Sequence, residues 1–209
     1  MNLRQRHLVP LILTLLIPVV AFGSIPDINQ CSIGTRATQD VSIMVCPGCD
    51  GPTFAEAQVF GGVVMDATIE VFIRNSAGQG IPGIPATDIV IDDGSFVFCP
   101  GGGHADYDTD GSGYTEFALP PCGGGCSTGP LFNGFLSGVS FLQNPISHVQ
   151  FNSPDSNGDL VVDLIDLADF AGVYFSGAVY CSDYYWDGVM NCWTWPCFPS
   201  TTGTCASRF

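Results

Sequence analysis

The stretch ATIEVFIR, residues 67–74, decides the fold class. Its aliphatic side chains Ile69, Val71 and Ile73 recur at every second position, so an extended chain would place all three on one face. The side chains between them are polar, charged or aromatic and would lie on the opposite face. This alternation is typical of a β-strand that buries one side in a core.

Short apolar runs separated by turn residues continue the pattern on both sides. The chain holds 26 Gly and 15 Pro but only 5 Lys and Arg together, a composition that favours strands and turns over helices. No part of residues 24–150 shows sustained helical periodicity. We therefore expect a mainly β fold, an Ig-like β-sandwich of about seven strands. The expected strands are 41–45, 67–74, 88–92, 96–99, 114–119, 134–142 and 147–152.

The first residues have the three-part layout of a secretory signal peptide. Arg4 and Arg6 precede an apolar run over 8–22, and small residues stand before a cleavage point after Gly23. The run is shorter than the ~20 residues that span a bilayer. We expect residues 1–23 to be removed, no membrane span to remain, and the protein to be secreted or displayed at the cell surface.

The chain is strongly acidic, with a formal net charge of −15. Such a surface repels nucleic acids and anionic membranes and attracts divalent cations. The charge therefore excludes nucleic-acid binding.

Ten cysteines fit an exported, oxidised protein, although spacing alone does not give their pairing. The close pairs Cys46–Cys49 and Cys122–Cys126 leave two alternatives open besides structural disulfides. They have the spacing of a four-thiolate zinc site, and the first has that of a redox CxxC. The expected oxidising compartment favours disulfides.

The segment SPDSNGDLVVDLIDLADF, residues 153–170, carries the strongest site pattern. Oxygen-bearing groups fall at positions 1, 3, 5, 7, 9 and 12 of a twelve-residue window, the layout of a calcium loop. Position 6 is Leu160 where a glycine is usual. The expected Ca2+ ligands are Asp155, Asn157, Asp159, the carbonyl of Val161, Asp163 and Asp166.

Helical periodicity follows this loop. Leu164, Leu167, Ala168 and Ala171 share one apolar face, and a glycine at 172 or 177 would end the helix. A weaker second window begins at residue 183 and ends at Thr194. Its candidate ligands are Asp183, Asp187 and Asn191.

The two windows together resemble the duplicated calcium loops of a type I dockerin, an EF-hand-like module. The resemblance implies that residues 153–209 form a small calcium-binding module with a degenerate second repeat. Dockerins pair with cohesin domains through hydroxyl-bearing residues beside the loops. Here Leu164-Ile165 and Cys192-Trp193 stand at those positions, and they do not favour a cohesin partner.

Upstream, the order of strand, IPGIP bend at 81–85 and TDGSGYTEF at 109–117 resembles a bacterial Ig-like domain of the invasin/intimin type. This resemblance covers roughly residues 40–150 and implies a spacer or adhesive module. We therefore expect an Ig-like β-sandwich domain over residues 24–152.

Signals for catalysis are few. After removal of the leader only His104 and His148 remain, and no nucleophile–base or metalloprotease motif includes them. The tail is rich in aromatic residues, which suit either stacking on sugar rings or packing in the tail's own core: Tyr180, Tyr184, Tyr185, Trp186, Trp193, Trp195 and Phe198.

The sequence thus predicts a secreted, calcium-binding structural or binding protein that is not an enzyme. Its partner would be a protein or carbohydrate at the cell surface. The alternatives are a carbohydrate-binding accessory module that uses the tail aromatics and, less favoured, a small extracellular hydrolase.

Overall fold

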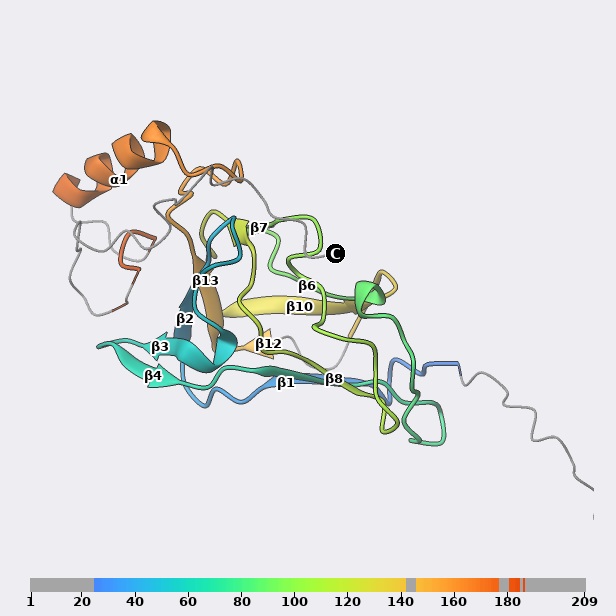
Figure 1. The fold of residues 1–209 in the computed structure, drawn as a ribbon. Coiled ribbons are helices and arrows are strands. Elements are labelled where there is room, and N and C mark those ends of the chain that lie inside the picture. Colours follow the sequence, from blue (N-terminus) through green and yellow to red (C-terminus); the bar gives the residue numbers. More distant parts are fainter. Residues whose placement is uncertain (1–24, 142–145, 177–180, 185, 187–209) are drawn as a thin grey trace, which may run out of the picture.

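The computed structural model describes residues 25–141, 146–176, 181–184 and 186. The described chain is mainly β, as predicted, and its strands form four small sheets followed by the helix α1 (Leu164–Ser176). Figure 1 shows α1 at one end of the molecule, away from the strands. The leader predicted over 1–23 lies outside the described residues.

The first sheet has the order β1-β5-β8, and its strands are β1 (Ser32–Thr35), β5 (Ile69–Phe72) and β8 (Tyr114–Phe117). The predicted alternation in β5 is confirmed. Ile69, Val71 and Ile73 are fully buried, whereas Glu70 and Phe72 remain half-buried on the other face. The turn before β8 is held by Asp110, whose Oδ1 accepts bonds from the amides of Ser112 at 2.8 Å and Tyr114 at 3.0 Å.

The second sheet is built on the longest strand, β10, which pairs antiparallel with β6, β11 and β12. The bounds are β6 (Ile89–Asp92), β10 (Leu131–Leu136), β11 (Val139–Ser140) and β12 (Ile146–Ser147). The expected single strand over 134–142 is therefore a hairpin between β10 and β11. Its turn has Ser137 at φ 47° and Gly138 at φ 80°, the left-handed region that a tight turn requires.

The third sheet has the order β13-β2-β3-β4, and its strands are β2 (Val41–Met44), β3 (Ala57–Val59), β4 (Val63–Met65) and β13 (Val149–Asn152). β13 runs parallel to β2, so the last strand returns beside one of the first. β3 and β4 form a hairpin that the sequence analysis did not predict, and β4 is the edge strand.

The fourth sheet pairs β7 (Val97–Phe98) with β9 (Gly123–Gly124). Two short 3-10 helices, Phe54–Glu56 and Ala86–Asp88, precede β3 and β6. The described residues thus hold thirteen strands in four sheets, in place of the expected seven. Four of the additional strands, β1, β3, β4 and β9, lie outside the expected ranges, and the expected strand over 134–142 is divided by the turn at Ser137–Gly138.

Phe151 lies at the centre of the core. Its ring is fully buried and contacts the rings of Phe54, Phe96, Phe98 and Phe132, with centroids 5.3–6.1 Å apart. Side chains from separate sheets thus converge on one residue of β13. This single cluster joins the small sheets into a common core.

Disulfides lie at the end of the strands from which α1 departs. Cys49 is bonded to Cys122, and Cys126 is bonded to Cys181. The first bond joins a cysteine of the pair Cys46–Cys49 to a cysteine of the pair Cys122–Cys126. These cysteines are therefore neither zinc ligands nor a redox CxxC, and both of those alternatives are wrong. Cys46 and Cys99 are also disulfide-bonded, and Cys31 is a buried free thiol.

Candidate functional site

The predicted calcium loop lies where the last strand, β13, gives way to α1. Asp155, its first residue, is fully buried. One carboxylate oxygen, Oδ1, accepts bonds from the backbone amides of Gly158 at 2.9 Å and Asp159 at 3.2 Å. The other, Oδ2, accepts a bond from the amide of Leu160 at 2.8 Å. Both oxygens of Asp155 therefore hold the backbone of the loop.

Asp166, the last residue of the loop, is arranged in the same way. It is fully buried in the first turn of α1. Its Oδ1 accepts bonds from the amides of Ser156 at 2.8 Å and Asn157 at 3.3 Å, and its Oδ2 accepts one from the amide of Asp163 at 2.8 Å. The two buried carboxylates close the loop from both ends by satisfying backbone donors.

The other predicted ligands of this loop make local hydrogen bonds. Asn157 donates to Asp159 Oδ2 at 3.1 Å, and Asp159 Oδ1 accepts from the amide of Val161 at 3.0 Å. Asp163 Oδ1 accepts from the amide of Ile165 at 2.7 Å. Leu160 has φ 69°, so position 6 takes the left-handed conformation without a glycine.

The EF-hand and dockerin assignment is wrong for this chain. Across 25–141, 146–176, 181–184 and 186, no three His, Cys, Asp or Glu side chains are grouped so that they could hold a metal ion. The physical reason is that the oxygens of Asp155 and Asp166 accept hydrogen bonds from the backbone amides of the loop. Calcium binding itself stays a prediction, which titration calorimetry of the oxidised protein would test.

The second predicted loop lies only partly within the described residues. Asp183 is buried, and its carbonyl accepts bonds from the side-chain amide of Asn152 at 3.0 Å and from the amide of Trp186 at 3.1 Å. Asp187 and Asn191 lie outside the described residues. Asp183 therefore ties the C-terminal segment to the end of β13.

The predicted helix is present, but its predicted apolar face does not pack against the sheets. Leu164 is 79 % exposed and Leu167 39 %, and Ala168 and Ala171 are also exposed. Phe170 instead is buried and stacks on Tyr184, with ring centroids 6.0 Å apart. The i, i+3, i+4 pattern identified the helix correctly but not its buried side.

Burial raises the pKa of Asp155 to about 6, an effect that the amide of Leu160 partly offsets and the charge of Asp166 adds to. Because this pKa is higher in the folded chain than in the unfolded chain, the ionised form costs stability. We expect the free energy of unfolding to fall as the pH rises from about 4 to about 6. Chemical denaturation at a series of pH values would measure this slope, and Asp155→Asn should remove it.

A carboxylate with a lowered pKa has the opposite effect on stability. Hydrogen bonds from Ser112 and Tyr114 lower the pKa of Asp110. The stability that ionised Asp110 contributes is therefore lost as the pH falls through this lowered pKa, below the range from pH 4 to pH 6. A slope of the opposite sign between pH 4 and 6 would contradict the assignment to Asp155.

Gly124 in β9 lies directly against the loop. A Cβ atom at this position would stand 1.7 Å from Asp155 Oδ2 and cannot be accommodated while the loop amides hold that carboxylate. We expect Gly124→Ala to lower the free energy of unfolding by about 3 kcal/mol. Gly129→Ala is the matched control, because a Cβ there meets nothing within 4 Å. Equal stabilities of the two variants in denaturant titrations would contradict this packing.

The two described histidines occupy different settings. His104 lines a cavity of about 430 Å³ beside β6, and burial lowers its pKa. His148 is on the surface, where its Nδ1 lies 2.8 Å from Asp40 Oδ1.

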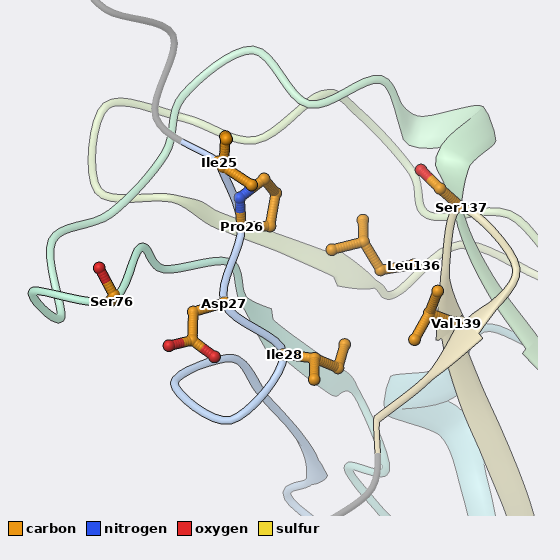
Figure 2. Close-up of a pocket in the computed structure, with 8 residues that line it drawn as sticks. All are labelled: Ile25, Pro26, Asp27, Ile28, Ser76, Leu136, Ser137 and Val139. Atoms are coloured by element: carbon orange, nitrogen blue, oxygen red, sulfur yellow. The ribbon is translucent and has the colours of Figure 1, made fainter.

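An open groove of about 600 Å³ lies at the N-terminal end of the described chain (Figure 2). Figure 2 shows Pro26 and Ile28 on one side of it and Leu136 and Val139 on the other. Asp27 is the titratable side chain of its described lining. Sequence reasoning missed this groove, because it is formed by segments more than 100 positions apart.

Two of the tail aromatics can be placed. Tyr184 is buried against Met44 and Phe170. The Trp186 ring packs on Phe60 with centroids 5.9 Å apart. Both therefore serve packing within the chain, whereas Tyr180, Tyr185, Trp193, Trp195 and Phe198 lie outside the described residues.

Comparisons with known proteins do not assign this chain to a family. No family model matches the chain, so neither the dockerin nor the invasin/intimin resemblance is supported, and no curated protein matches. Among solved structures, the crystal structure of the Lin-41 filamin domain is similar at 15 % identity and a TM-score of 0.29, covering 63 % of this chain and 98 % of that one. A TM-score this low carries no conclusion about fold or function.

Proposed function

We propose that this chain is a secreted, non-catalytic structural or binding protein of the cell surface or extracellular space. The observation that supports it best is the pair of disulfides, Cys49–Cys122 and Cys126–Cys181. Such bonds persist in oxidising compartments and indicate an extracellular environment. None of the described helices is long and apolar enough to cross a membrane.

The positions of the disulfides support a structural role. Cys126–Cys181 links the segment after α1 back to the strands across 55 positions. The bond from Asn152 to the Asp183 carbonyl and the bond from the Gly61 amide to the Trp186 carbonyl hold the same segment at two further points. Cross-links of this kind slow unfolding and proteolysis. Slow unfolding matters for an extracellular protein, because no chaperones refold it there.

The settings of the candidate catalytic groups favour a non-catalytic role. His148 pairs with a surface carboxylate, and burial lowers the pKa of His104. Asp155 and Asp166, the two buried acids of the loop, are engaged by backbone amides. Both buried carboxylates thus hold the backbone of the loop.

Expression of the full chain in a secreting host tests this proposal. We expect oxidised protein in the medium or on the cell surface, and no turnover in a broad hydrolase panel that includes glycoside and ester substrates. Turnover that survives repurification, or a product retained in the cytosol with all of its cysteines reduced, would contradict the proposal.

A further inference from the structure

The hairpin of β3 and β4 carries an exposed apolar surface, which we call the hairpin patch: Phe60, Val63 and Val64. These side chains are 61 %, 64 % and 60 % exposed. Residues 57–65 contain no charged side chain, although the chain as a whole is strongly acidic. Among the strands that the structure describes, β4 is also at the edge of its sheet. An uncharged, apolar edge strand is prone to pair with another chain unless something covers it.

The C-terminal segment already reaches this patch at one residue. The Gly61 amide donates to the Trp186 carbonyl at 2.8 Å, and the Trp186 ring packs edge-on against Phe60. Tyr184, two positions earlier, is buried beside Met44 of β2. The chain therefore runs from the Cys126–Cys181 bond, past β2, to the tip of the hairpin.

The sequence beyond Trp186 matches the patch in chemistry. Residues 188–207 contain no charged side chain and include Val189, Met190, Trp193, Trp195 and Phe198. Val63 and Val64 lie only three and four positions from Phe60, so a few residues of extended chain are enough to reach from Trp186 across them. Covering these side chains removes apolar surface from water.

We propose that residues 187–209 of the same chain dock on the hairpin patch and cover Phe60, Val63 and Val64. Trp186 is the anchor that starts this contact. The tail aromatics then complete the packing of the β3–β4 edge. This inference is independent of the proposed function, since it holds wherever the protein acts.

A second copy of the chain is the competing occupant. Pairing two β4 edges would bring together two chains that each carry a formal net charge of −15. Such like charges oppose association, most strongly at low salt. The tail brings no such repulsion, and its attachment at Trp186 makes its docking intramolecular.

Photo-crosslinking in the full-length, oxidised protein tests the proposal. The photoreactive residue p-benzoylphenylalanine replaces Val64 in one variant and Val139, which is exposed on β11, in the control. After irradiation at low salt, the sample is reduced, digested and analysed by mass spectrometry. We expect the Val64 variant to give intrachain crosslinks to peptides of 187–209, and the Val139 variant to give none.

Three outcomes would overturn the proposal. The first is a Val64 variant without tail crosslinks, and the second is a covalent dimer on a denaturing gel as its main product. The third is tail crosslinks from a probe at Leu164, on the exposed side of α1, with none from Val64. A second measurement guards against a misfolded variant: Phe60→Ser should reduce the protection of 187–209 peptides from hydrogen exchange while β5 and β13 stay protected. Unchanged tail protection would also overturn the proposal.

Discussion

Phe151→Ala is expected to lower the free energy of unfolding by about 3–5 kcal/mol, the largest effect that we predict for a single substitution. The side chain is fully buried, and its ring contacts four other rings that come from different parts of the chain. Removing it leaves a cavity at the point where the sheets meet. Denaturant titration followed by circular dichroism measures the loss.

Val139→Ala is the matched control for this substitution. Val139 is apolar but 55 % exposed, so its truncation should change the free energy of unfolding by less than about 0.5 kcal/mol. A loss below about 1 kcal/mol for Phe151→Ala would show that the aromatic cluster does not organise the core.

Loss of the Cys126–Cys181 bond is expected to have a comparable effect. The bond closes a loop of 55 positions, and the chain-entropy argument assigns about 4 kcal/mol to such a loop. The double variant Cys126→Ser/Cys181→Ser removes the bond without leaving an unpaired thiol. Unfolding by denaturant, compared with the oxidised parent protein, measures the difference.

Cys31→Ala serves as the control, because Cys31 is a free thiol and its loss breaks no covalent bond. The double serine variant should also be cleaved faster by added protease than this control is. If the double variant were as stable as the control and as resistant to the protease, the proposal that this disulfide stabilises the fold would be wrong.

The strands were predictable where burial alone decides them. In β5 every second side chain faces the core, and this alternation is visible in ATIEVFIR. The β3–β4 hairpin was missed because Val63 and Val64 are both exposed and do not alternate. Its Gly61-Gly62 pair, at φ 100° and 78°, was the available turn signal.

The parallel pairing of β13 with β2 joins residues more than 100 positions apart, and no local pattern encodes such a contact. The aromatic cluster around Phe151 depends on it. For the same reason the open groove between Ile28 and Val139 could not be read from the sequence.

The acidic loop shows a different limit. Spacing placed Asp155 and Asp166 at the first and last positions of one predicted calcium loop, and both are buried. The spacing did not show that backbone amides would donate hydrogen bonds to the carboxylate oxygens of these two residues. A carboxylate that closes a turn and one that binds an ion follow similar spacing, because both need a tightly curved backbone. The direction of the oxygens separates the two, and only the structure supplies it.

Non-reducing peptide mapping of the full chain, expressed with residues 1–23 in a secreting host, tests the central claim most directly. The claim is that this is an exported β protein braced by disulfides. The account predicts linked peptides for Cys49–Cys122 and for Cys126–Cys181, with Cys31 recovered as a thiol after unfolding in an alkylating agent. Recovery of Cys122 and Cys181 as alkylated thiols, or linked to other cysteines, would contradict it.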